Sequence, residues 1–220
     1  MEGMFAEAGM FNQPVNFDTS SVHNMSWMFH GAWSFNQPLD LDTLSVTDMR
    51  CMFCNAGAFD QSLNFNTSSV RIMKDMFWNA TTFNQPLNFD VSSATDMQYM
   101  FFNASSFNQN LCSWGELLND RTINVSSMFH GTSCPLQEDP NLDSKPPGPF
   151  CHHCGELLCF EDGYDLYDAF RVPQSRSLHV YGSPIGSWCV NKVKDFSLTF
   201  SYLHNFNEPL SNWDTSMATK

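Results

Sequence analysis

A 24-residue repeat runs through the first half of the chain and constrains its fold more than any other feature. Residues 76–90 read Met-Phe-Trp-Asn-Ala-Thr-Thr-Phe-Asn-Gln-Pro-Leu-Asn-Phe-Asp, and the fixed letters return one period before and after. The recurring phenylalanines are Phe5, Phe29, Phe53, Phe77 and Phe101, then Phe11, Phe35, Phe59, Phe83 and Phe107. A fixed period of 20–50 residues indicates stacked copies of one supersecondary unit. We therefore predict an α/β solenoid with about 24 residues per coil.

Each unit has three parts with different local preferences. Met73, Met76, Phe77 and Ala80 follow the i, i+3, i+4, i+7 spacing of an apolar helical face, which predicts one or two turns of α- or 3₁₀-helix. Pro86 ends this segment. Residues 94–97 then predict a short strand, and successive strands would stack in parallel. The recurrent Phe, Met and Leu side chains are expected to point inward and to stack from coil to coil.

Polar positions also recur and have structural interpretations. Amide side chains, with Asp60 replacing one of them, are expected to satisfy backbone groups up the stack; they are Asn12, Asn36, Asn84 and Asn108. A second column of acids and one amide is expected to cap turns rather than to bind calcium, because no Asp-x-Asp-x-Asp-Gly run is present; it contains Asp18, Asp42, Asn66 and Asp90.

The period changes along the chain and predicts three regions. Residues 1–111 hold five repeats, and residues 112–163 form a Cys-rich cap and linker, in which the next Met-Phe pair arrives 28 residues after Met100-Phe101. Residues 164–220 start a second, truncated array that opens with a short helix over Tyr164–Phe170. The sequence opens inside a repeat without a capping unit, so we expect a fragment of a longer protein.

Eight cysteines predict disulfides in an oxidising compartment. The candidates are Cys112, Cys134, Cys151, Cys154, Cys159 and Cys189. We favour a Cys112–Cys134 pair, with Cys151 or Cys154 holding the linker, although connectivity does not follow from sequence. A zinc site at Cys151-His152-His153-Cys154 is a less favoured alternative, because no second spaced Cys/His pair follows. Cys51 and Cys54 occupy variable positions and are expected to be unpaired or incidental.

Composition narrows the function classes. The net charge of −13 argues against binding the nucleic-acid backbone, which needs Lys/Arg clusters. No run of apolar residues is long enough to span a membrane, and no signal peptide is visible. No nucleophile elbow, phosphate-binding glycine loop or spaced metal-ligand cluster occurs. We therefore expect no enzymatic activity, no cofactor and no metal.

The repeat resembles that of the BspA-like surface-protein family of the leucine-rich-repeat superfamily. The match is carried by residues 97–109, Met-Gln-Tyr-Met-Phe-Phe-Asn-Ala-Ser-Ser-Phe-Asn-Gln, and by residues 206–216, Phe-Asn-Glu-Pro-Leu-Ser-Asn-Trp-Asp-Thr-Ser. The family usually has Trp where this chain has Phe17, Leu41, Phe65 and Phe89. The resemblance implies a right-handed, leucine-rich-repeat-like coil on extracellular or cell-surface proteins, with adhesion or protein recognition as the usual proposed role.

A repeat array of this kind predicts a binding scaffold, with variable positions as contacts for a protein or glycan partner. The candidate contacts are Trp27, His30, Trp33, Trp78, Tyr99 and Phe102. A purely architectural spacer is the alternative, in which these side chains pack on neighbouring coils. Five Asn-x-Ser/Thr sequons are glycosylation candidates in a secreted chain, namely Asn24, Asn66, Asn79, Asn103 and Asn124.

Overall fold

The computed structural model describes residues 1–118, 121–154, 160, 162–170, 188, 190, 192–203, 206–207, 210 and 213–219. The chain divides into two compact units, residues 1–151 and residues 152–220. In the described ranges, helix α1 spans Ser113–Leu118 and helix α2 spans Gly163–Ala169. Helix α2 lies one residue from the bounds predicted for a short helix there. The predicted boundaries after residues 111 and 163 stay predictions.

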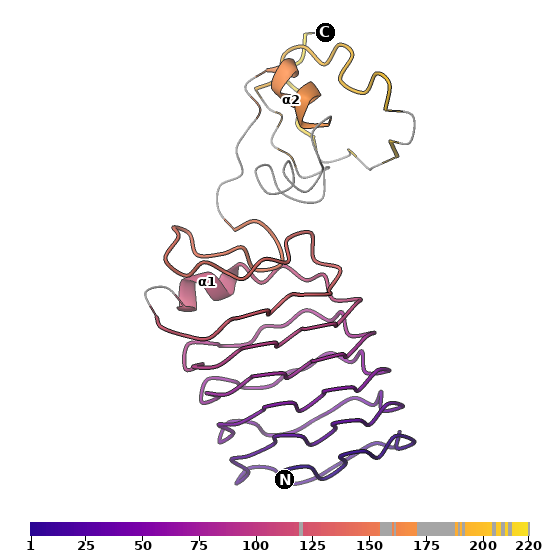
Figure 1. The fold of residues 1–220 in the computed structure, drawn as a ribbon, viewed down its shortest axis with the longest axis vertical. Coiled ribbons are helices and arrows are strands. Elements are labelled where there is room, and N and C mark those ends of the chain that lie inside the picture. Colours follow the sequence, from indigo (N-terminus) through magenta and orange to yellow (C-terminus); the bar gives the residue numbers. More distant parts are fainter. Residues whose placement is uncertain are drawn as a thin grey trace. The chain divides into compact units, whose positions relative to one another are not determined.

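The first unit consists of coils that lie one above another, and each sequence repeat forms one coil (Figure 1). Neighbouring coils are joined by single parallel bridges, Asn24 to Asp48, Asp48 to Ile72, Ile72 to Asp96 and Asp96 to Asn124. The last bridge spans 28 residues rather than 24, because α1 lies within the longer unit. The insertion is therefore absorbed without loss of alignment between the coils.

Two columns of phenylalanine form the core of these coils. Phe29, Phe53, Phe77 and Phe101 are fully buried, and consecutive rings lie 5.5–5.7 Å apart within 8° of parallel. Within one coil, Phe77 also stacks on Phe83 at 4.1 Å. Phe129 continues the first column at 5.8 Å from Phe101, although it breaks the 24-residue spacing. The methionines and alanines of the Met-Phe segments are buried as well, at 0% exposure in the coils of residues 25–104.

The Met-Phe segments bury the predicted side chains but are not helical. Met73, Met76, Phe77 and Ala80 are all fully buried. The backbone over these residues forms hydrogen-bonded turns, and positive φ angles of 58° at Asp75 and 56° at Asn79 exclude a right-handed helix. The predicted helical turns are therefore wrong, and the predicted strand at 94–97 is reduced to the single bridge at Asp96.

The turns leave every second N–H free to bond the next coil. Met73, Asp75, Phe77 and Asn79 donate to the carbonyl oxygens of Asp96, Gln98, Met100 and Phe102, at 2.8–2.9 Å. The same pattern joins residues 25–31 to residues 48–54, 49–55 to 72–78, and 97–103 to 124–130. This hydrogen-bonded ladder fixes the position of each residue relative to its counterpart one coil later.

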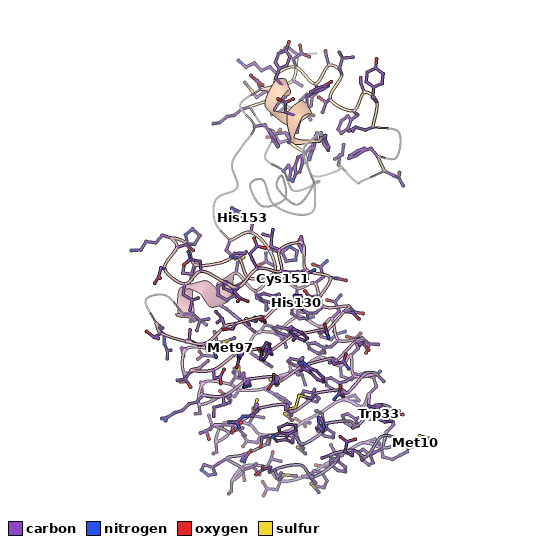
Figure 2. All side chains as sticks on the ribbon, in the orientation of Figure 1. Met10, Trp33, Met97, His130, Cys151 and His153 are labelled. Carbon is purple, nitrogen blue, oxygen red and sulfur yellow. A yellow bond between two sulfur atoms is a disulfide. The ribbon has the colours of Figure 1, made fainter. Side chains whose placement is uncertain are left out.

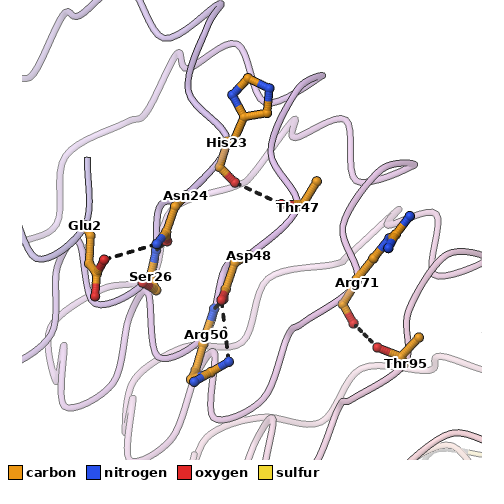
Figure 3. Close-up of polar contacts among 9 residues, drawn as sticks. All are labelled: Glu2, His23, Asn24, Ser26, Thr47, Asp48, Arg50, Arg71 and Thr95. Carbon is orange, nitrogen blue, oxygen red and sulfur yellow. Dashed lines mark hydrogen bonds and ion pairs between the residues drawn. The ribbon is translucent and has the colours of Figure 1, made fainter.

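Polar side chains extend the ladder along the other sides of each coil. The Oδ1 atom of Asn36 accepts from the backbone N–H of Asp60 at 3.0 Å, and Asn84 accepts from Asn108 at 2.9 Å. Asp60 keeps the same bond to Asn84 at 2.9 Å, so the predicted polar column is continuous. Figure 3 shows hydroxyls in an equivalent role, with Thr47 donating to the carbonyl of His23 at 3.2 Å.

The second unit has its own core and is described only in part. Phe160, Leu166, Ala169, Trp188, Val190 and Val193 form its buried cluster. Phe200 and Phe206, six residues apart like Phe77 and Phe83, lie 4.8 Å apart at 33°. The sequence match of residues 184–188 to residues 209–213 falls mostly outside the described residues. A second repeat array, and the leucine-rich-repeat-like class of the first, remain predictions.

Candidate functional site

Two columns of residues differ from coil to coil, while the Met-Phe pair that lies between them in the sequence stays constant. The first residue of each pair has a positive φ of 52–61° and the second follows three residues later, so both lie at one turn. We name these ten residues the variable strip: Trp27, His30, Cys51, Cys54, Asp75, Trp78, Tyr99, Phe102, Ser127 and His130. The backbone ladder aligns them, since Trp78, Phe102 and His130 each accept a hydrogen bond from the preceding coil.

Five of the six predicted contact residues lie in this strip. Trp27 is 38% exposed, whereas His30, Trp78, Tyr99 and Phe102 are half-buried. The structure brings Trp27 and His30 together edge to face, with ring centroids 5.0 Å apart. Tyr99 and Phe102 make a similar contact at 5.5 Å. The strip therefore presents aromatic pairs rather than isolated rings.

The strip contains one aromatic-stacking residue, His130, that the sequence did not indicate, and one of the predicted contact residues, Trp33, lies elsewhere. The ring of His130 stacks on Phe102 at 5.1 Å, and the 28-residue spacing hides this alignment in the sequence. Trp33 is 63% exposed and packs over Gly9, where an added Cβ would lie 3.2 Å from the indole. Figure 2 shows Trp33 and the exposed Met10 at the same edge of the coils. Trp33 is therefore not part of the variable strip.

Asp75 is the acidic residue of the strip, and burial raises its pKa above the ordinary value. Lys74 and Arg50 partly oppose this effect, and Asp96 adds to it. Because its folded-state pKa is raised, Asp75 contributes most to the stability of the fold when it is protonated, below its unfolded-state pKa. This contribution is lost as pH rises through the folded-state pKa. The ionised carboxylate thus disfavours the folded state at neutral pH.

We expect Asp75→Asn to raise the midpoint of thermal unfolding by about 1–3 °C at pH 7 and to have no effect below about pH 3. Asp90→Asn is the matched control, because the pKa of Asp90 is shifted in the opposite direction. The hydroxyl and the backbone N–H of Ser92 lower the pKa of Asp90, so its carboxylate stabilises the fold above the unfolded-state pKa. Asp90→Asn should therefore be neutral or slightly destabilising at pH 7. A pH series of thermal melts checks both, and a lower midpoint for Asp75→Asn at pH 7 would contradict the assignment.

Cys51 and Cys54 form a disulfide, so the prediction that they are unpaired is wrong. Their sulfurs meet because positions three residues apart face the same side of the turn, as Tyr99 and Phe102 also do. His30 lies one coil earlier, with Nδ1 3.7 Å from Cys51 Sγ and Nε2 2.8 Å from the Glu7 carboxylate. Both cysteines are almost fully buried.

The favoured Cys112–Cys134 pairing is also wrong, because Cys134 is bonded to Cys151. The N–H of Leu136 donates to the carbonyl of Cys151 at 3.2 Å, which places Cys134, two residues before Leu136, near Cys151. Cys112 and Cys154 are disulfide-bonded as well. The zinc alternative at residues 151–154 therefore lacks free thiolates. Cys159 and Cys189 lie outside the described residues.

The acidic column caps turns as predicted. The carboxylate of Asp18 accepts hydrogen bonds from the hydroxyl and N–H of Ser20, at 2.7 and 3.1 Å, which lower its pKa. Asn66 makes the same two bonds to Ser68. Among the sequons, Asn66, Asn103 and Asn124 are exposed and Asn24 and Asn79 are half-buried; the amide of Asn79 donates to Asn55 at 2.8 Å.

The second unit has a half-open cavity of about 910 Å³, beside α2. Its described lining includes Tyr164, Tyr167, Lys192, Lys194 and Asp195. Ammonium groups, phenols and a carboxylate of this mixture do not converge on one reaction chemistry, so the variable strip is the stronger candidate site. No helix in the described part of the chain is long and apolar enough to cross a membrane.

Comparison with protein families places the chain in one of them. The family model described as "Mycoplasma protein of unknown function, DUF285" matches residues 1–64, 40–140 and 166–220. No curated protein and no solved structure matches the chain significantly. The matched ranges include both the phenylalanine columns and the whole variable strip.

Proposed function

Because the chain belongs to the DUF285 family, whose description assigns no activity, we propose a function from the variable strip itself: a non-enzymatic repeat scaffold that recognises a protein or glycan partner. The observation that carries the proposal is the row of partly exposed aromatic side chains at aligned positions. Trp27, Trp78, Tyr99 and Phe102 occur where the fold leaves the residue type free. Tyr and Trp are also the residues most enriched among energetically dominant interface contacts.

The backbone supports recognition by holding these rings in place. The ladder of hydrogen bonds through residues 73–79 and 97–103 restricts the backbone of the strip. A prearranged surface loses less conformational entropy on binding than a mobile loop does. The strip also mixes aromatic rings with one acid and one exposed imidazole, which suits a partner with both apolar and polar groups.

We place this scaffold outside the cell, on a surface or in secreted form, in agreement with the BspA-like resemblance. The disulfides are compatible with an oxidising compartment. In that location, the better glycan acceptors are the three exposed ones, Asn66, Asn103 and Asn124. Asn79 is a poorer one, since a glycan on its amide would disturb the bond to Asn55.

The test is affinity capture of surface-labelled cell proteins and glycoproteins by the full chain and by Trp78→Ser/Phe102→Ser. A recognition scaffold should lose at least tenfold in the amount of an identified partner that it captures. Leu44→Ser/Leu117→Ser is the matched control, because these exposed leucines lie outside the strip. Thermal melts confirm that each variant is folded.

The half-buried state of Trp78, Tyr99 and Phe102 favours the second candidate, an architectural spacer in which the rings only pack on neighbouring coils. No specific partner, or equal capture by the folded strip variant, would support the spacer and reject the recognition surface. Loss of capture after enzymatic removal of glycans from the labelled cells would identify the partner as a glycan.

A further inference from the structure

Three side chains that are typical metal ligands meet at one end of the variable strip. One ligand atom from each of His30, Cys51 and Cys54 lies within 4.8 Å of the other two. Zinc prefers imidazole nitrogen and thiolate sulfur, and a two-residue gap between cysteines is common in its sites. We propose that the reduced Cys51/Cys54 pair binds Zn²⁺ together with His30 Nδ1, and that the disulfide is the form of this site that binds no metal.

The distances fit such a site. Tetrahedral zinc with a nitrogen at about 2.0–2.1 Å and a sulfur at about 2.3 Å places these two atoms about 3.6 Å apart. The observed separation of His30 Nδ1 and Cys51 Sγ is 3.7 Å. Reduction frees the two sulfurs to separate to the spacing of about 3.8 Å that two thiolates on one tetrahedral ion adopt.

The surroundings also suit the reduced form. Cys54 Sγ lies 2.9 Å from the carbonyl oxygen of Asp75, and Cys51 Sγ faces the imidazole nitrogen. A disulfide sulfur has no hydrogen to donate, so the contact of Cys54 with the Asp75 carbonyl is not a hydrogen bond in the oxidised protein. After reduction, the Cys54 thiol has this carbonyl as an acceptor, and the Cys51 thiol has Nδ1 in the tautomer of His30 that donates its Nε2–H to Glu7. The surroundings of the two sulfurs therefore suit two thiol groups, whose protons a metal ion can displace.

Glu7 orients the histidine for this role. Its carboxylate lies 2.8 Å from His30 Nε2, the arrangement in which a carboxylate holds a metal-ligating imidazole by its second nitrogen. Gly31 makes the approach of Glu7 feasible, because a Cβ there would lie 2.9 Å from the carboxylate. The next coil has Asn55 at the same position, so the glycine occurs in the coil that carries His30 and not in the one after it.

The reaction balances with a thiol as the reductant. Two thiol molecules supply two electrons and two protons to the Cys51–Cys54 bond and become one disulfide, leaving two S–H groups on the protein. Zinc then binds both sulfurs as thiolates and releases two protons. The fourth position of the ion is left to water or an external ligand.

The test titrates Zn²⁺, and Co²⁺ as a spectroscopic substitute, into the full chain before and after reduction with a phosphine. Reduced protein should bind one ion and show the thiolate-to-cobalt charge-transfer absorption, whereas oxidised protein should show neither. Cys51→Ser/Cys54→Ser should abolish this absorption. His30→Ala and Glu7→Gln should weaken binding, by at least about tenfold for Glu7→Gln, as expected for an outer-shell partner.

Cys134→Ser/Cys151→Ser is the control, because phosphine reduces that disulfide as well. The absorption should persist in this variant. The decisive comparison uses the Cys134→Ser/Cys151→Ser background, which removes Cys151 from the alternative site at residues 151–154 that reduction would free. In this background, absorption that survives Cys51→Ser/Cys54→Ser, or a folded reduced protein that binds no Co²⁺, overturns the proposal. If the double cysteine variant fails to fold, unchanged affinity in His30→Ala has the same consequence, since circular dichroism can verify that this variant is folded.

Discussion

Phe77→Ala is expected to lower the free energy of unfolding by about 3–5 kcal/mol, the range for phenylalanine truncation in a packed core. Phe77 is fully buried and contacts the rings of Phe53, Phe83 and Phe101, at 5.5, 4.1 and 5.5 Å. Its removal leaves a cavity in the middle of the column and weakens two coil–coil interfaces at once. Because each coil is stabilised mainly by its neighbours, the loss cannot be confined to one repeat.

Urea unfolding of the full chain, followed by far-ultraviolet circular dichroism, measures this effect. Leu44→Ala is the control, since Leu44 is 55% exposed and its truncation should change stability by less than about 0.5 kcal/mol. Similar midpoints for the two variants would show that the stacked rings are not what stabilises the coils.

Removal of the Cys134–Cys151 disulfide should cost about 3 kcal/mol. The cysteines are 17 residues apart, and loop-closure entropy of the unfolded chain gives this magnitude. The bond closes the segment that covers the last coil, where Leu136 donates to the carbonyl of Cys151 at 3.2 Å. Cys134→Ser/Cys151→Ser should therefore loosen residues 130–151 before the repeats unfold.

The Cys51–Cys54 bond is a comparison within the same chain. Its sequence separation of 3 limits the entropic gain to about 2 kcal/mol, so Cys51→Ser/Cys54→Ser should be the less destabilised variant. Non-reducing urea unfolding ranks the two variants, and hydrogen exchange locates the loosened region. The reverse order would mean that native contacts, rather than loop entropy, dominate at one of these bonds.

Side-chain burial in the repeats was predictable, whereas backbone conformation was not. The spacing of Met73, Met76, Phe77 and Ala80 correctly marks a buried face, yet a run of turns buries the same positions as a helix would. The deciding feature is the positive φ at Asp75 and Asn79. Aspartate and asparagine tolerate this conformation, but Trp27 and Tyr99 at equivalent positions give no such signal.

Five of the ten residues of the candidate site were named from the sequence, but their arrangement was not. The variability of positions such as Trp78 and Phe102 is visible in the sequence, and so is the constancy of their neighbours. That residues three apart contact each other follows only from the turn, which explains why the Cys51–Cys54 disulfide was missed. The alignment of His130 with Phe102 depends on how α1 absorbs four extra residues, and this is a tertiary effect.

The ladder between coils also has an electrical consequence. Met73, Asp75, Phe77 and Asn79 all donate toward the following coil, and their counterparts in the other coils do the same. The peptide groups in these bonds therefore point one way, whereas neighbouring peptides of an ordinary sheet alternate. Each contributes a dipole of about 3.5 D, so the side of the stack that carries the ladder has its positive pole toward the coil of residues 124–130 and its negative pole toward residue 1. The N–H groups of Thr47, Arg71 and Thr95 donate to the preceding coil, and their peptides oppose part of this dipole.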